Sequence, residues 1–355
     1  MSTGLALPAP VTGARGVDGL SPLGSLRDLL GDPAYQAVVL GSSKDPNAKV
    51  TVLLLPAEPN RTAVAVKVPT TDVAAGAVVA EARLLAGLQR LGEAAILATV
   101  PKPLGTLDSD GRPALAVEVL PGAPMATAYH RWRHTARARA VAADFAAAAT
   151  WLARFQEATA AGTWRLTDAA RLATGLRDRF AGEAGLESGL DSALGVLAAI
   201  DQRLSGQTVA ACAVHGDYWF GNLLVERAGG PVRGVVDWEA GELSGSPLRD
   251  LTRFPVAYAL YLDRHTRSGR AVAGHRGLRA GEWGAGLRFA IESVSWFGDL
   301  FRRFLSGGLD RLGVHGVSAA DLAMLGIAEV AVLADHGEFA RQHVELLGRI
   351  GRAGP

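Results

Sequence analysis

Short apolar runs separated by turn-forming residues make up the first third of the chain. Three runs rich in Val and Leu cover residues 35–40, 50–55 and 63–68, and the segments between them contain Gly, Pro, Asn and Asp. Because turns favour these residues, the pattern predicts three antiparallel strands. Two further strands are predicted at 102–107 and 113–120, joined by a turn of sequence Asp-Ser-Asp-Gly-Arg.

A helical pattern interrupts this series of strands. Residues 72–91 carry apolar side chains, among them Val78 and Leu85, at positions that approximate one face of a helix. Asp72 is the expected N-cap because its short carboxylate can accept a backbone N–H of the first turn. Residues 26–120 are therefore predicted to form a five-stranded antiparallel sheet with one helix inserted after the third strand.

The character of the chain changes after residue 120. Residues 136–160 and 168–204 are rich in Ala, Leu and Arg with helical spacing, and a short strand is predicted at 209–213. A hairpin follows, and the chain is again helical after Pro255. The pattern predicts an α+β protein with a small β-rich lobe and a larger, mainly helical lobe.

We expect three parts along the chain. Residues 1–25 are rich in Gly, Pro and small side chains without periodicity, which indicates a loose N-terminal arm. Residues 26–120 form the first lobe and residues 121–355 the second.

Composition excludes several classes of protein. The net charge of +1 gives no global field that would favour nucleic acid or an anionic membrane. One cysteine permits no intramolecular disulfide. The N-terminus lacks the pattern of a signal peptide, and no apolar run reaches the roughly 18 residues of a membrane span. We expect a cytoplasmic protein, a monomer or homodimer, with neither nucleic acid nor membrane as partner.

Candidate chemistry gathers in two neighbouring segments. His215-Gly216-Asp217 follows a strand, and Asn222 stands five positions after Asp217 at the start of an apolar strand. A hairpin then returns to Asp237, so we expect Asn222 and Asp237 to lie close together. An amide oxygen and a carboxylate at such spacing suit Mg²⁺ with phosphate oxygens completing its shell. Asp217 could orient an acceptor hydroxyl and take its proton, as phosphoryl transfer requires.

These motifs resemble those of the aminoglycoside phosphotransferase and choline kinase superfamily, which has a protein-kinase-like fold. The resemblance rests on His-Gly-Asp followed by Asn, on Val-Asp-Trp-Glu and on the downstream Gly-Ser-Pro-Leu-Arg-Asp-Leu. It implies a bilobal enzyme that uses ATP or GTP with Mg²⁺. Asp217 would be the catalytic base, Asn222 and Asp237 the metal ligands, and His215 and Asp250 supports of the loop.

Lys67 gives a second indication in the first lobe. It stands in an apolar strand, where an ammonium group is costly without a partner. By the resemblance Lys67 would bind the nucleotide phosphates and pair with Glu81 on the following helix. The alternatives are an outward-facing strand lysine and a Glu81 on a solvated helix face.

Further nucleotide contacts follow from the same resemblance. Glu118 and Leu120 stand where backbone groups would pair with the purine. Ser42 and Ser43 lie in the turn that would cover the phosphates, although this turn is not a Gly-x-Gly-x-x-Gly loop.

The acceptor is less defined. Tyr218 and Trp219 could stack on an acceptor ring, with packing beneath the loop as the alternative, and Glu239 is a further acceptor-binding candidate. Residues 256–355 contain 12 arginines against 10 acidic residues. A segment without acidic excess favours a neutral sugar or a nucleoside-type molecule over a polycationic aminoglycoside.

The leading hypothesis is an O-phosphotransferase that phosphorylates a hydroxyl of a small molecule, an antibiotic above all. The alternatives are a sugar or amino-alcohol kinase of primary metabolism and a kinase-like binding protein without catalysis.

Overall fold

The computed structural model describes residues 20–42, 47–58, 62–91 and 93–353. The chain divides into two compact units after Gly122. The segment Arg233–Leu243 returns to unit 1, and unit 2 holds Ala123–Val232 and the chain from Ser244 onward. Asp237 therefore belongs to unit 1, although the sequence analysis placed it in the second lobe.

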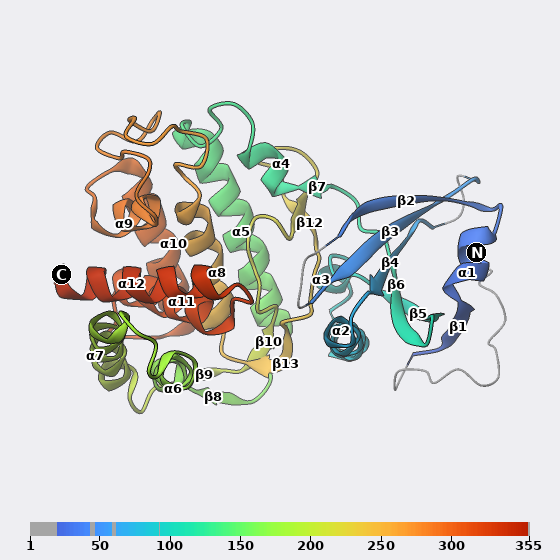
Figure 1. The fold of residues 1–355 in the computed structure, drawn as a ribbon, viewed down its shortest axis with the longest axis horizontal. Coiled ribbons are helices and arrows are strands. Elements are labelled where there is room, and N and C mark those ends of the chain that lie inside the picture. The colour runs from blue at the N-terminus through green and yellow to red at the C-terminus, as the bar shows by residue number, and fades with distance from the viewer. Residues whose placement is uncertain (1–19, 43–46, 59–61, 92, 354–355) are drawn as a thin grey trace. The chain divides into compact units, whose positions relative to one another are not determined.

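Unit 1 is built on one sheet with helix α2 as its longest helix (Figure 1). Its elements are β1 (Pro22–Ser25), α1 (Leu26–Gly31), β2 (Tyr35–Ser42), β3 (Lys49–Pro56), β4 (Val64–Pro69), α2 (Asp72–Leu91), α3 (Ala94–Leu97), β5 (Pro103–Ser109), β6 (Arg112–Glu118) and most of β12 (Val232–Val235). The five predicted strands and the predicted helix are all present.

The sheet differs from the prediction by an added strand. Within the described residues its order is β1-β5-β6-β4-β3-β2, and β1 pairs with β5 in parallel, so the sheet is mixed rather than wholly antiparallel. Gly105 allows β1 to approach, because a Cβ there would lie 2.4 Å from the carbonyl oxygen of Ser21. The prediction of a loose N-terminal arm is thus wrong for Pro22–Ser25. Residues 1–19 of that predicted arm lie outside the described residues.

The N-terminus of α2 is capped by a different residue from the predicted one. The Thr71 hydroxyl accepts the N–H of Ala74 at 3.1 Å. Asp72 is the first residue of the helix, and its carboxylate accepts Arg112 Nε at 3.0 Å. Thr71 had an equally suitable side chain, and pairing with Arg112 on β6 is a tertiary contact that helix signals do not report.

Unit 2 is mainly helical (Figure 1). Its elements are β7 (Ala123–Pro124), α4 (Met125–Tyr129), α5 (Ala138–Ala158), β8 (Thr163–Arg165), α6 (Asp168–Phe180), α7 (Glu187–Leu204), β9 (Thr208–Ala210), β10 (Cys212–Val214), β11 (Leu223–Val225), the second half of β13 (Glu242–Gly245), α8 (Leu248–Leu260), α9 (Ala285–Glu292), α10 (Trp296–Leu312), α11 (Ala319–Leu333) and α12 (Gly337–Ala353).

Two helical predictions in unit 2 need correction. The pattern at 168–204 is broken into α6 and α7, because Gly182 and Gly185 adopt φ of +76° and +80°, which no helix contains. The predicted helix after Pro255 begins earlier, since α8 starts at Leu248 and includes Pro255.

Helices α8 and α10 pack closely against each other in the core of unit 2. A Cβ at Gly308 would lie 2.3 Å from Leu251, so the glycine lets the two helices meet. Phe297 and Phe301 on α10 are fully buried. No helix of the described residues is both long and apolar enough to cross a membrane.

His343 on α12 is a buried histidine with one satisfied nitrogen. Its Nδ1 lies 2.7 Å from the carbonyl oxygen of Phe339 and acts as donor, while Nε2 is buried and has no hydrogen-bond partner among the described residues. The rings of Phe339 and Trp283 pack on it at centroid distances of 4.5 and 4.8 Å. Burial lowers the pKa of His343 to about 4.

Because His343 is buried in its neutral form, we expect the protein to lose stability on acidification. The unfolded chain binds a proton at His343 below a pH of about 6.5. The folded protein resists protonation until about 4. Neutral His343 therefore adds its full contribution to the free energy of unfolding above a pH of about 6.5. This contribution falls as the pH drops toward 4, and about 2 kcal/mol of it is lost at a pH of about 5. Urea unfolding at neutral pH and at pH about 5 measures it. His343→Phe should reduce the difference between the two conditions, and an unchanged difference would contradict this account.

Candidate active site

Lys67 of β4 meets two carboxylates in unit 1. Its Nζ lies 2.7 Å from both oxygens of Glu81 on α2 and 2.7 Å from Oδ1 of Asp237. The side chain of Glu81 is 2% exposed. The structure thus forms the Lys67–Glu81 pair that the resemblance implied, and adds Asp237, which was predicted separately as a metal ligand.

Local sequence explains how the ion pair forms. Glu81 stands three positions after Val78 and four before Leu85, so all three share the buried face of α2. The sheet presents Lys67 to this face. Burial by itself lowers the pKa of Lys67, but the charges of Glu81 and Asp237 outweigh it and hold the pKa above its usual range. Lys67 is therefore a fixed cation.

The backbone at Asp237 is strained. Its φ of +71° lies in the left-handed region, which residues with a side chain rarely adopt. The fully buried Trp238 holds this turn, since its Nε1 donates to the Val235 carbonyl at 2.7 Å and its backbone N–H donates to Glu81 at 3.0 Å. Such strain is common at functional sites, where the surrounding structure enforces it.

Glu239 also has partners within unit 1. Its carboxylate forms an ion pair with Lys49 of β3, and Asn47 Nδ2 donates to it at 3.2 Å. The structure therefore places Glu239 in a polar cluster of the sheet.

The His-Gly-Asp segment of unit 2 is held by a buried carboxylate. Asp250 on α8 is 1% exposed and accepts the backbone N–H groups of His215 at 2.7 Å and Gly216 at 2.9 Å. Burial raises the pKa of Asp250, against the effect of the nearby His215 and of the two N–H groups. His215 is itself fully buried, and its Nδ1 accepts the N–H of Asp217 at 3.1 Å.

Asp217 is fixed from both sides. Oδ1 accepts Arg253 Nε at 2.9 Å and Nη2 at 2.7 Å. Oδ2 accepts Asn222 Nδ2 at 3.0 Å, and the same amide nitrogen reaches the Asp217 carbonyl. The amide nitrogen of Asn222 is thus committed to Asp217, and within the described residues no donor reaches its oxygen.

Arg253 is the site residue that sequence reasoning missed. It follows Asp250 by three positions, so both lie one turn apart on the same side of α8. That spacing was a usable signal once Asp250 was linked to the loop.

The three aromatic residues that follow Asp217 differ in how deeply they are buried. Tyr218 and Phe220 are fully buried, and the Tyr218 hydroxyl donates to the Ala148 carbonyl at 2.8 Å. Tyr218 therefore has no surface to offer an acceptor, and the packing alternative holds for it. Trp219 is half-buried, with its ring centroid 6.3 Å from that of Tyr261.

The remaining nucleotide candidates are only partly described. Ser43 lies outside the described residues, and of Ser42 only the backbone, the last residue of β2, is described. The N–H of Glu118 donates to the Lys102 carbonyl at 3.0 Å, so it is not available to a purine. Leu120 follows β6 outside any strand and is half-buried.

The donor set is suited to a hard cation. No three His, Cys, Asp or Glu side chains gather into a cluster in the part of the chain that is described. Mg²⁺ commonly takes only one or two protein oxygens and completes its shell with phosphates and water. The amide oxygen of Asn222, in unit 2, and the carboxylate of Asp237, in unit 1, are each of the kind that Mg²⁺ accepts, and their joint binding of Mg²⁺ stays a prediction.

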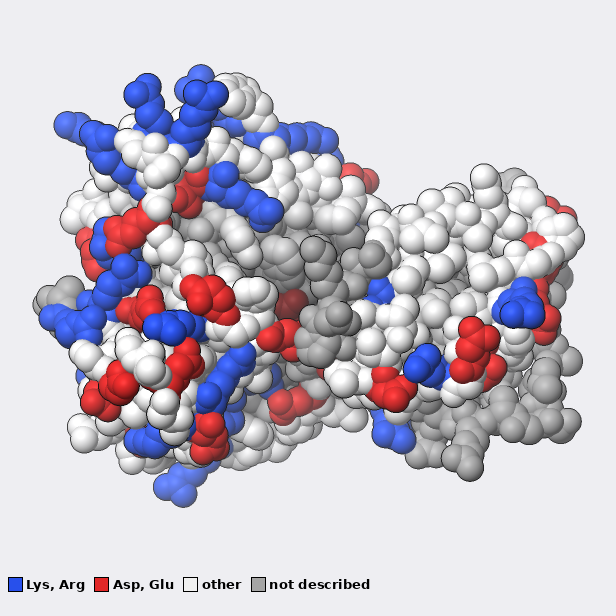
Figure 2. Space-filling model, viewed as in Figure 1, with Lys and Arg blue, Asp and Glu red and all other residues white. Residues whose placement is uncertain are grey.

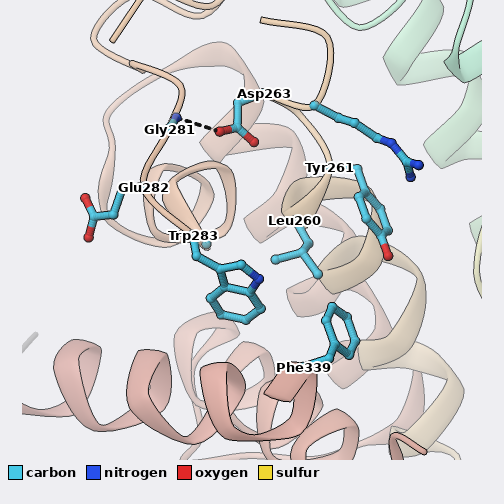
Figure 3. Close-up of a pocket in the computed structure, with 9 residues that line it drawn as sticks. Leu260, Tyr261, Asp263, Gly281, Glu282, Trp283 and Phe339 are labelled. Carbon is cyan, nitrogen blue, oxygen red and sulfur yellow. Dashed lines mark hydrogen bonds between the residues drawn. The ribbon is translucent and has the colours of Figure 1, made fainter. Parts of the chain in front are cut away.

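A separate pocket opens in unit 2 beside the loop. It has a volume of about 340 Å³ and is lined by the end of α8, the segment before α9 and Phe339 of α12 (Figure 3). Tyr261 on its wall approaches the ring of Phe220 at 6.1 Å between centroids. Glu282 is paired with Arg288 and Arg349, whereas the carboxylate of Asp263 accepts only the N–H of Gly281, at 3.3 Å, among the described residues.

Comparison with known proteins gives the family. The model of the phosphotransferase enzyme family matches residues 51–285, more than half of the chain. The chain therefore belongs to this family of phosphotransferase enzymes. A sequence search of curated proteins found no significant match.

Solved structures share the fold. A protein from Ralstonia eutropha proposed to be an aminoglycoside phosphotransferase is 15% identical, with a TM-score of 0.53 over 92% of this chain and 96% of that one. The complex of APH(2″)-IIIa with GDP and kanamycin is 14% identical, with a TM-score of 0.51 over 91% and 95%. The GDP complex of aminoglycoside 2′-phosphotransferase-IIIa is 13% identical, with a TM-score of 0.50 over 92% and 96%.

The ion pair in unit 1 predicts strong coupling between Lys67 and Glu81. Lys67→Met leaves two carboxylates without their cation and should destabilise the protein by about 3 kcal/mol. Glu81→Gln retains the bond to Trp238 and removes the charge. A double-mutant cycle in urea should give a coupling of about 2 kcal/mol.

The control is the exposed pair Lys102–Glu118, whose charged atoms are 3.7 Å apart. It should couple by less than about 0.5 kcal/mol. Equal coupling in the two pairs would show that burial gives the Lys67 pair no special strength.

Proposed function

We propose that this protein transfers the γ-phosphoryl group of ATP or GTP to a hydroxyl of a small molecule. The observation that carries the proposal is the fixed carboxylate of Asp217, held by Arg253 and Asn222 in a loop braced by Asp250. Membership of a phosphotransferase family supports the same reaction.

In the proposed reaction Asp217 orients the acceptor hydroxyl. The acceptor oxygen forms a bond to the γ-phosphorus while the bond to the β,γ-bridging oxygen breaks, and the nucleoside diphosphate leaves. The hydroxyl proton passes to the carboxylate of Asp217. Oδ2 is the better placed oxygen, because it accepts one hydrogen bond whereas Oδ1 accepts two from Arg253.

Unit 1 would hold the nucleotide. Lys67, fixed by Glu81, supplies a permanent positive charge for the phosphates. Asn222 and Asp237 would hold Mg²⁺, which when bound neutralises charge on the phosphates. Backbone groups near Leu120 and the turn at Ser42 and Ser43 are the proposed purine and phosphate contacts. Structures of the same fold contain GDP, which supports a nucleotide donor.

We place the acceptor in the pocket of Figure 3. Tyr261 links its wall to Trp219 and Phe220 of the catalytic loop. Trp283 and Phe339 add aromatic surface. The lining contains Asp263 and Glu282 against Arg264, and Glu282 is already paired with Arg288 and Arg349, so the net charge around the pocket is small.

This lining favours an acceptor with an apolar face and few charges, consistent with an antibiotic of neutral sugar or nucleoside type. A polycationic aminoglycoside would find one carboxylate without an ion-pair partner among the described residues, Asp263, since arginines already pair with Glu282.

Asp217→Asn tests the catalytic role. The amide keeps the size of the side chain but cannot take the proton, so turnover should fall at least about 100-fold. Phosphate release from ATP and GTP with Mg²⁺, measured against pooled antibiotics, sugars and amino alcohols, gives the rate. Mass spectrometry then identifies the phosphorylated molecule. Nucleotide affinity should be unchanged, and full turnover in the variant would refute the proposed base.

Trp283→Ala tests the acceptor pocket. Loss of the indole should raise KM for the acceptor by about 10- to 100-fold, with little change in kcat or in KM for the nucleotide. Trp132→Ala is the matched control because Trp132 is 84% exposed and outside the pocket. An equal effect of the two substitutions would place the acceptor elsewhere.

A further inference from the structure

A second pocket of unit 2 is lined almost entirely by cationic and small side chains. It has a volume of about 570 Å³, within the range of small-molecule sites. Its charged lining consists of Arg131, Arg137, Arg139 and Arg227, with His134 beside them. Ala and Gly residues complete the wall.

These four arginines are not neutralised by the protein. Among the described residues, no carboxylate forms an ion pair with any of them, and none lines the pocket. His134, in contrast, does have an acidic partner, because its Nε2 lies 2.7 Å from Oδ2 of Asp144. Elsewhere in unit 2 arginines such as Arg249 and Arg253 do have acidic partners. The pocket is thus a local concentration of positive charge.

Sequence and helix geometry reinforce this charge. Residues 119–143 contain no Asp or Glu. Helix α5 begins within this segment, with Arg137 at its N-cap, no side-chain cap and no acidic residue in its first turn. The N-terminus of a helix carries partial positive charge, so the arginines there oppose the helix dipole. A bound anion would offset the repulsion among the arginines and also their unfavourable interaction with the helix dipole.

Basic side chains are common in the part of unit 2 that contains the pocket. Figure 2 shows Lys and Arg side chains gathered along the upper edge of unit 2, where α4 and the segment before α9 lie in Figure 1, while both signs mix over its lower part. The whole chain has a net charge of only +1, which gives no long-range attraction to a nucleic acid. A bounded pocket with such charge fits a small polyanion better than an extended one.

We propose that the pocket binds a small molecule carrying two or more phosphate groups. Guanidinium forks match phosphate oxygens in pairs, and four of them suit a ligand with several such groups. The site lies outside the proposed catalytic residues and acceptor pocket, so it goes beyond the proposed function and stands without it.

Calorimetric titration with inorganic tripolyphosphate tests the proposal. The full chain should bind it with a stoichiometry of one, and binding should weaken as NaCl is raised from about 50 to about 300 mM. The double variant Arg137→Gln/Arg227→Gln should bind at least about 10-fold more weakly. Arg177→Gln, an exposed arginine of α6, is the matched control and should bind as the unmodified protein does.

Two further measurements define the site. Binding should persist when a non-hydrolysable ATP analogue with Mg²⁺ is saturating, and Arg137→Lys/Arg227→Lys should restore part of the affinity lost in the glutamine variant. Absence of binding, equal binding by the glutamine variant or complete competition by the nucleotide would overturn the proposal. Tighter binding of a single-stranded oligonucleotide with the same arginine dependence would overturn it in favour of a nucleic-acid surface.

Discussion

A buried carboxylate needs hydrogen-bond donors. In each unit of this protein, backbone N–H groups close to a candidate site residue donate to such a carboxylate. Asp250 accepts the N–H groups of His215 and Gly216. Glu81 accepts the N–H of Trp238 in addition to the ammonium of Lys67. The loops that carry Asp217 and Asp237 are thereby fixed by two buried carboxylates, and the proposed chemistry depends on that constraint.

Hydrogen bonds and ion pairs also fix the orientation of the two candidate carboxylates, Asp217 and Asp237. Asp217 is held on one oxygen by Arg253 and on the other by Asn222, so the direction of its carboxylate is fixed before an acceptor arrives. Such preorganisation removes a reorientation step from the reaction. Asp237 is held by the ammonium of Lys67 on its carboxylate and by a main-chain turn with positive φ, which the buried ring of Trp238 supports.

Unit 2 adds two pockets with opposite character. The pocket at Tyr261, Trp283 and Phe339 is aromatic and nearly neutral, whereas the pocket at Arg137 and Arg227 is cationic. The near balance of charge over residues 256–355 agrees with the first pocket, whereas the residues that line the second lie outside that range. Local clustering of like charges, which depends on which loops meet, decides what each surface can bind.

The sequence by itself determined five strands of the unit 1 sheet, the helix at 72–91 and the candidate motifs, because alternation, helical spacing and fixed motif distances are local properties of a chain. It could not determine that Pro22–Ser25 pairs with β5, that Arg253 fixes Asp217, or that Tyr218 is buried. Those outcomes depend on contacts between segments far apart in the chain. Only the tertiary structure decides such contacts, since burial and pairing are properties of the assembled core.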